Sequence, residues 1–76
     1  MVYPNPFSNS INIENTETID HILFYTVQGQ LLQSVEGNEK KVLIEDLRHL
    51  PDGPVIMKVI YGNQVIILQL IKQGMD

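Results

Sequence analysis

The chain has 76 residues, no cysteine and a formal net charge of −4, from five basic and nine acidic side chains. This length allows one domain with a small core, and without cysteines neither disulfides nor thiolate metal sites can stabilise it. The acidic balance argues against binding to nucleic-acid phosphates, which requires a basic surface.

The first segment reads VYPNPF, from Val2 to Phe7, and places two prolines around an asparagine. Proline fixes φ, lacks a backbone N–H and biases the preceding residue toward extended conformations. We therefore expect residues 1–9 to form an extended entry segment, with Phe7 as the first large side chain to anchor. Met1 is followed by no basic and apolar leader, so we predict no signal peptide here. No apolar run reaches the ~20 residues that cross a bilayer as a helix.

Apolar and polar residues alternate along most of the remaining chain, and Val, Ile and Tyr are frequent while Ala is absent. This pattern predicts strands rather than helices. We expect six strands, at Ser10–Glu14, His21–Thr26, Gln30–Val35, Lys41–Ile44, Val55–Tyr61 and Gln64–Lys72. Turn residues separate them at positions 14–16, 28–29, 37–38, 51–54 and 62–63. Short strands with this spacing predict a small all-β sandwich or barrel.

Two of the predicted strand junctions are specific enough to give local geometry. At Gln28-Gly29 we expect a type I turn with Gly29 in a left-handed bulge, which pairs Phe24 with Leu32. His21 and Tyr25 then lie on the opposite face from Ile22 and Phe24. Pro54 cannot donate to a strand ladder, so its strand is expected to pair fully only from Val55 onward.

The last two strands fix their own register, because Gly62-Asn63 suits a two-residue turn. This turn predicts an apolar core face made by the opposed pairs Val59–Ile66, Met57–Leu68 and Val55–Leu70. The reverse face carries Ile56, Ile60, Val65 and Ile67 around Lys58. Two explanations for it remain open, cover by another strand or loop and docking of another chain. As a sheet edge, the last strand can also recruit a partner by strand addition.

Few side chains could carry a reaction. His21 and His49 fall in separate elements without metal-ligand spacing, and the acidic residues between positions 45 and 52 lack the spacing of a calcium loop. There is no Gly-rich phosphate loop and no nucleophile elbow. We therefore predict no catalytic, cofactor-binding or metal-binding residue, and no enzyme activity.

Four stretches, taken in chain order, resemble one known family: YPNP followed by Phe7, FYTVQGQL from Phe24, LPDG from Leu50, and LIK ending at Lys72. Together they resemble the type A C-terminal sorting domain of the type IX secretion system, found in certain Gram-negative bacteria. The resemblance covers Val2 to about Gln73. It implies a small immunoglobulin-like antiparallel β-sandwich of about six to seven strands over residues 10–73, between the entry segment 1–9 and a tail at 74–76.

Three features depart from the family pattern. Thr26 stands where the family often has an aspartate that would accept a hydrogen bond in the turn, and Val55, after Pro54, stands where an aromatic residue is usual. Residues 74–76 extend beyond the usual basic end.

The resemblance also implies a function. Such a domain is a C-terminal signal that directs a cargo through the periplasm and the outer membrane to the cell surface or the medium, and a sortase-like peptidase then removes it at or before Val2. The expected partners are the secretion and sorting machinery and an upstream cargo domain, and a homodimer through the last strand is a further expectation. We expect no nucleic acid, membrane span or cofactor.

Two other functions are alternatives to this one. The first is an immunoglobulin-like interaction or spacer module that stays on a cell-surface protein or enzyme. The second is a carbohydrate-binding module, which would need an exposed aromatic row that the scattered Tyr3, Tyr25 and Tyr61 do not provide.

Two sets of site residues follow from these arguments. We expect partners to recognise the last hairpin through Lys58, Gly62, Asn63, Ile67 and Lys72, all predicted to be exposed. The family motifs supply a second set with structural roles, namely Tyr3, Pro4, Asn5, Pro6, Gly29, Leu50, Pro51 and Gly53.

Overall fold

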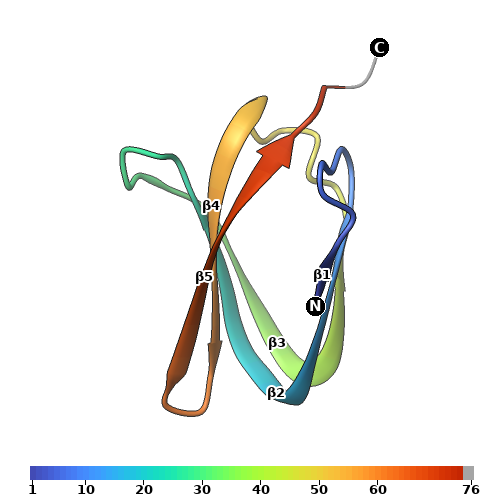
Figure 1. The fold of residues 1–76 in the computed structure, drawn as a ribbon, viewed down its shortest axis with the longest axis vertical. Helices are drawn as coiled ribbons and strands as arrows, with labels where there is room; N and C mark the ends of the chain where they lie inside the picture. The colour runs from blue at the N-terminus through green and yellow to red at the C-terminus, as the bar shows by residue number, and fades with distance from the viewer. Residues whose placement is uncertain (75–76) are drawn as a thin grey trace.

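The structure, a computed structural model, describes residues 1–74 and contains five strands and no helix within them (Figure 1). The strands are β1 (Val2–Tyr3), β2 (Ile11–Tyr25), β3 (Leu31–Ile44), β4 (Gly53–Tyr61) and β5 (Gln64–Lys72). They form one antiparallel sheet in the order β1-β2-β4-β5, with β3 also paired to β2. The all-β prediction is confirmed.

Two long, bent strands replace four of the strands that the sequence predicts. The expected strands at 10–14 and 21–26 are the two halves of β2, and those at 30–35 and 41–44 are the two halves of β3. The ladder shifts register twice between Glu14 and His21 and continues through the bend. The described residues therefore hold five strands rather than six or seven, because the turn-like residues at 14–16 and 37–38 bend the strands without ending them.

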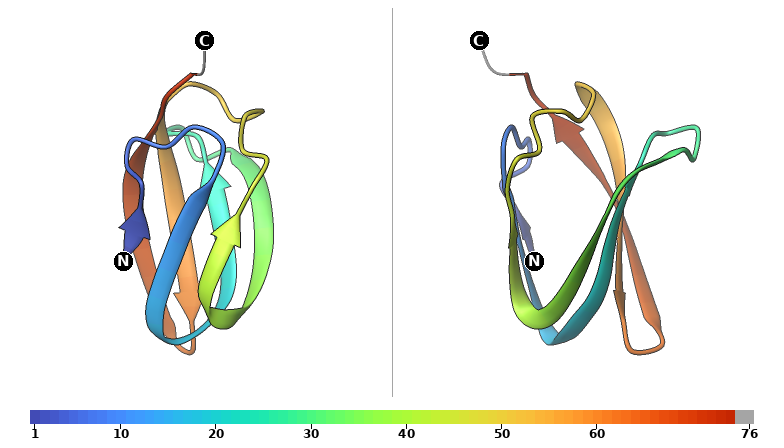
Figure 2. Two further views of the ribbon diagram at one scale, coloured as in Figure 1. Left: turned by 90° about the vertical axis from the view of Figure 1, so that its right-hand side faces the viewer. Right: turned by 180° about the vertical axis from the view of Figure 1, so that it is seen from behind.

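The bend folds the sheet over on itself into two layers (Figure 2). One layer contains β1 and the adjoining halves of β2 and β3, and the other contains the remaining halves with β4 and β5. At the bend, Gly37 lies against the backbone of Ile19, and a Cβ on Gly37 would stand 2.4 Å from the Ile19 carbonyl oxygen. Only glycine fits this close approach of two backbones.

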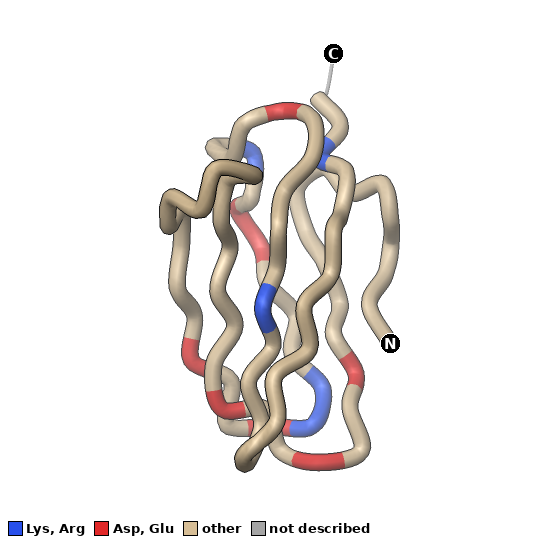
Figure 3. The backbone as a smooth tube through the Cα atoms, turned by 60° about the vertical axis from the view of Figure 1, so that its left-hand side comes forward, with Lys and Arg blue, Asp and Glu red and all other residues tan. Residues whose placement is uncertain are grey.

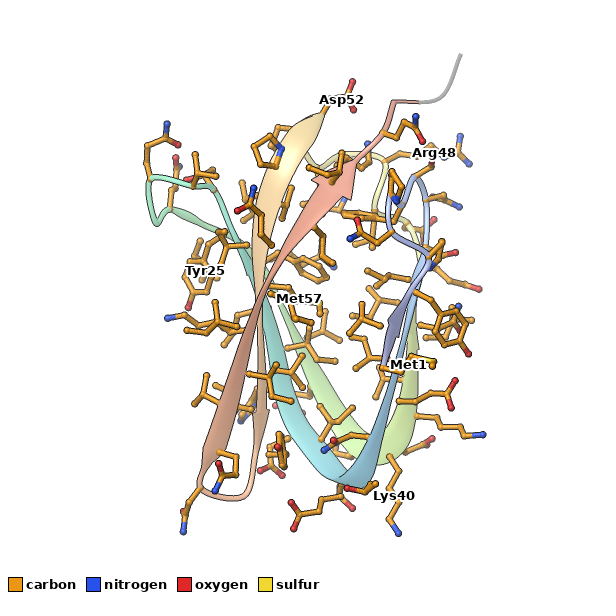
Figure 4. The ribbon with its side chains drawn as sticks, in the orientation of Figure 1. Met1, Tyr25, Lys40, Arg48, Asp52 and Met57 are labelled. Atoms are coloured by element: carbon orange, nitrogen blue, oxygen red, sulfur yellow. The ribbon has the colours of Figure 1, made fainter. Side chains whose placement is uncertain are left out.

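The core lies between the two layers. Inward-facing side chains of β2 and β4 alternate with outward-facing ones, as the pleat of a strand requires, and Met57 points into this interior (Figure 4). The buried apolar side chains are Phe7, Ile11, Ile13, Ile19, Ile22, Phe24, Ile44, Leu47, Leu50, Val55, Met57, Val59 and Leu70.

The register predicted for the β4–β5 hairpin is confirmed along its whole length, from Tyr61–Gln64 to Val55–Leu70. The prediction for the β2–β3 hairpin is confirmed only in part. Gly29 has a φ of 96° and the ladder is bulged, but Phe24 pairs with Gln33 and not with Leu32. The bulge falls at Leu32 itself, because Tyr25 pairs with Leu31 and Leu32 is the extra residue.

Pro54 lies inside β4, opposite Ile71, so the strand starts earlier than predicted. The backbone N–H and C=O of Ile71 bond away from β4, to Asn5 and Phe7. The opposed backbone groups of Pro54 therefore point away from β5, toward the side where β2 has already ended at Tyr25. No ladder hydrogen bond is lost to the proline there.

Replacing the glycine at the bend tests this account of the two layers. We expect Gly37→Ala to lower the free energy of unfolding by ~1–3 kcal/mol, because the new methyl group overlaps the Ile19 carbonyl. Urea denaturation measures the change. Ser34→Ala, at an exposed position of the same strand, serves as the control, and equal stability of the two variants would contradict the account.

Candidate recognition surface

The proline-containing segment binds to the end of the last strand. We call residues 4–7 the N-terminal strap. The Asn5 side-chain Oδ1 accepts a hydrogen bond from the Ile71 N–H (3.1 Å), and the Phe7 N–H donates to the Ile71 carbonyl (2.9 Å). The Gln73 N–H in turn donates to the Phe7 carbonyl (2.7 Å), which makes a parallel bridge between Phe7 and Lys72. The strap thus acts as a short additional strand beside β5.

This geometry explains why the strap tolerates two prolines. Its backbone donor in these contacts is the N–H of Phe7, and at Asn5 the side chain supplies the acceptor. The Tyr3–Pro4 and Asn5–Pro6 peptide bonds are both cis. Phe7, with 1% of its surface exposed, anchors the strap in the core as predicted.

β1 holds the other end of this segment against β2. Val2 pairs with Ile13, and the Glu14 N–H donates to the Met1 carbonyl (2.7 Å). The Tyr3 hydroxyl donates to the Glu14 carboxylate. This hydrogen bond raises the pKa of the Tyr3 phenol above its ordinary value, with smaller contributions from desolvation and from the negative charge of Glu14.

Lys72 is not exposed, and this part of the sequence prediction is wrong. Only 4% of its surface is accessible. Its ammonium Nζ donates to the carbonyls of Arg48 (3.4 Å) and Leu50 (3.3 Å) and to Asp52 Oδ1 (3.3 Å). Lys72 is buried because the loop between β3 and β4 crosses the end of β5, so that carbonyl oxygens replace water around the charge. Arg48 and Asp52 lie at this end of the molecule in Figure 4.

The loop that covers Lys72 carries the LPDG motif. Leu47 and Leu50 are buried, and the Leu47 N–H donates to the Asn9 carbonyl (2.8 Å). Gly53 begins β4 with a φ of 103°, a conformation that side chains other than glycine rarely adopt. The motif thus positions both the apolar contacts and the carbonyl that hold the end of β5.

Thr26, at the position where the family often has an aspartate, accepts hydrogen bonds that close the turn after β2. The Thr26 hydroxyl Oγ1 accepts a hydrogen bond from the Gln30 N–H (3.0 Å), and the Thr26 carbonyl accepts one from the Gly29 N–H (2.9 Å). Thr26 therefore supplies a side-chain acceptor in the turn, so the departure from the family pattern preserves the hydrogen bond.

All five predicted recognition residues belong to the β4–β5 hairpin, and four of them lie at its surface. Gly62 and Asn63 are exposed at its tip, and Ile67 is 61% exposed on its outer face. Lys58 is half-buried, with its ammonium 4.9 Å from the centre of the Tyr25 ring. This distance is typical of a cation–π interaction, which holds the Lys58 ammonium over the Tyr25 ring on the neighbouring strand β2.

Sequence reasoning missed Asp20, which fixes the hairpin tip. Its carboxylate Oδ2 accepts a hydrogen bond from the Gly62 N–H (2.9 Å), although the two residues are 42 positions apart. No local sequence pattern predicts a contact over this separation. The tip is therefore held by the bend of β2 as well as by its own turn.

The outer face of the hairpin is apolar and largely uncharged. Ile56 and Ile60 are half-buried, whereas Val65 and Ile67 are 55% and 61% exposed, so the rest of residues 1–74 leaves these two side chains uncovered. The sequence left two explanations for this apolar face, and the first, cover by another strand or loop, does not hold for Val65 and Ile67. Figure 3 shows several of the acidic positions at the end of the molecule where β2 and β3 bend. Lys58 is the one charged residue of β4.

Residues 1–74 contain no group of three or more His, Cys, Asp or Glu placed to hold a metal ion. Within the same residues no helix has the length and hydropathy to span a membrane. The expected tail at 74–76 falls mostly outside the described residues, which end at Gly74.

The family model described as "Secretion system C-terminal sorting domain" matches residues 1–73. The chain belongs to this family, the C-terminal sorting domains of the type IX secretion system. These domains mark proteins that are secreted through the outer membrane to the cell surface or the extracellular space. A search of curated proteins finds no match to the chain.

The buried lysine gives a testable consequence for stability. We expect Lys72→Ala to lower the free energy of unfolding by ~1–3 kcal/mol, because it leaves the carbonyls of Arg48 and Leu50 without their buried donor. Urea denaturation measures this, with Lys40→Ala at an exposed position as the control. If both variants unfolded at the wild-type urea concentration, Lys72 would not fasten the end of β5.

Proposed function

We propose that this sorting signal is recognised through the surface of its β4–β5 hairpin. Membership of the family makes the domain a secretion signal with an upstream cargo and partners in the secretion machinery. The observation that carries the proposal is the exposed apolar pair Val65 and Ile67, next to the exposed tip Gly62-Asn63. Lys58 adds one positive charge to this surface. In this proposal Lys72 holds the end of the hairpin in place and does not itself contact the partner.

The fastenings support this assignment because they hold the hairpin in one position. Asp20 fixes its tip, the strap pairs with its far end, and Lys72 ties that end to the β3–β4 loop. A rigid surface loses little conformational entropy on binding. We propose that the domain acts by this binding alone and carries no catalytic activity.

Export of a cargo fused upstream of the domain tests the proposal. Deletion of Gln69–Asp76 removes the end of β5, and we expect the cargo to stay in the periplasm, as measured by cell fractionation. The sharper variant is Ile67→Ser, which we expect to reduce export severalfold while circular dichroism shows an unchanged fold. Leu43→Ser, at a position 55% exposed on β3, is the matched control. Normal export of the deleted cargo would overturn the proposal.

We further propose that a sortase-like peptidase cuts the cargo from the domain upstream of β1. The supporting observation is that Val2 and Tyr3 are paired with Ile13 and Asn12 of β2, whereas a peptidase needs an extended segment free of other pairing. The entry segment 1–9 therefore stays with residues 10–73 after cleavage, and the junction with the cargo precedes Val2.

Mass spectrometry of the released domain tests the position of the cut. We expect a fragment that contains the whole of β1, beginning at or before Val2. A fragment that begins inside the strap or after it would place the cut within the folded domain and contradict the proposal.

An immunoglobulin-like interaction or spacer module, retained on a mature surface protein, is the alternative. It is favoured by the two-layer form of the sheet and by the exposed Val65 and Ile67. Peptides from residues 10–73 on the mature surface protein would support it, and their absence would support removal.

A further inference from the structure

The outer edge of β5 is open over part of its length. The backbone groups of Ile71 and Gln73 point outward to the strap. Since these groups alternate in direction along a strand, those of Val65, Ile67 and Gln69 also point outward. β4 is the one strand paired to β5 among the described residues, and the strap reaches only its last residues. Within the stretch 65–69, the backbone donors and acceptors of these three residues are therefore unpaired.

The chemistry of this edge differs from that of the sheet's other long free edge. β3 pairs with β2 alone, and charged Glu36, Glu39, Lys40 and Lys41 line it. Such charges discourage strand addition. β5 has no charged residue from Gln64 to Ile71, so nothing along its open edge repels another strand of the same sequence.

An apolar groove runs beside the open edge. It lies between β1 and β5, has a volume of about 290 Å³ and is lined mainly by apolar side chains, including Val2, Ile13, Ile66 and Leu68. Ile66 and Leu68 face the core side of β5 but are only half-buried. A strand added to β5 would place its own inward side chains over this groove.

We propose that the occupant of this edge is β5 of a second copy of the chain, paired antiparallel about a two-fold axis at Ile67. This register opposes Ile67 to the partner's Ile67, Val65 to the partner's Gln69, and Gln69 to the partner's Val65. These pairs match the open stretch 65–69, and each exchanges two hydrogen bonds, about six in all. The inference does not depend on the proposed secretion function.

Both faces of the paired strands are then complementary. On the groove side, Ile66 opposes the partner's Leu68, and Leu68 opposes the partner's Ile66, as closely spaced apolar pairs. On the outer side the two Ile67 side chains meet. Lys58 and the partner's Lys58 lie three strand spacings apart, about 14 Å, which exceeds the ~8 Å screening length at physiological salt.

The strap limits the length of the interface. Asn5 and Phe7 occupy the edge of β5 beside Ile71, so pairing cannot extend past Gln69. Two five-residue strands bury less than the ~1,200 Å² of a standard stable interface. We therefore expect a weak, reversible dimer with a dissociation constant of roughly 10 µM to 1 mM.

Sedimentation velocity of the whole chain from 10 µM to 1 mM tests the proposal. We expect the mass of the wild type to rise from 8.7 kDa toward twice that value. Ile67→Lys places two ammonium groups opposite each other at the axis, and we expect it to raise the dimer dissociation constant more than about tenfold. Ile67 is already 61% exposed, so the fold is retained. Leu43→Lys, an equal change at a 55% exposed position, should leave the dimer intact.

A spin label on Ile67→Cys reads the register directly, because the chain has no other cysteine. In the dimer the two labelled residues are directly opposed, with Cα atoms ~5.5 Å apart, so its spectrum should broaden with concentration while that of a label on Leu43→Cys does not. A wild type that stays at 8.7 kDa to 1 mM, an unaffected Ile67→Lys dimer, or broadening at Leu43 alone would each overturn the proposal. So would a monomer that binds an added extended apolar peptide at this edge.

Discussion

The bridge between Phe7 and Lys72 is the interaction on which the arrangement of the domain depends. It joins segments 65 positions apart and brings the strap beside the end of β5. Around it, the Asn5 side chain bonds the Ile71 N–H, and the buried Lys72 ammonium bonds the loop before β4. The bond from Lys72 to the Leu50 carbonyl is buried, where leaving a partner unsatisfied is costly, whereas the bond to Asn5 is exposed. The end of β5 is thereby fixed from both sides.

The bend in β2 and β3 is the second constraint. A five-stranded antiparallel sheet with one apolar face must cover that face, and residues 1–74 contain no helix that could lie over it. The sheet covers itself instead, because both long strands turn at the point where Gly37 passes the Ile19 carbonyl. The same bend brings Asp20 to the tip of the β4–β5 hairpin, so the position of the exposed hairpin follows from the curvature of the sheet.

Local patterns were sufficient for some elements and insufficient for others. The β4–β5 register could be predicted because Gly62-Asn63 defines a short turn and the alternation of side chains then leaves one arrangement with an apolar face. The four predicted short strands could not be recognised as two long ones, because residues 14–16 and 37–38 have turn composition whether a strand ends or bends there. The predicted Phe24–Leu32 pair failed by one residue, since sequence alone does not locate a bulge.

The recognition set shows the same division. Four of its members lie at the surface of the hairpin, since their placement follows from local register. Lys72 was misassigned because a lysine at the end of a strand normally reaches solvent, and only the path of a loop 20 to 24 residues away reverses this. Asp20 was missed for the same reason, since its partner is 42 residues distant.

The fastening of residue 7 to residues 71–73 has a consequence for biosynthesis. A ribosome makes the strap first and its partner last, and an exit tunnel conceals the newest part of a chain. The bridge between the strap and the end of β5 therefore forms only once synthesis has passed position 73, after the whole of any upstream cargo has been made. A product truncated before that position lacks the residues that hold the strap against β5.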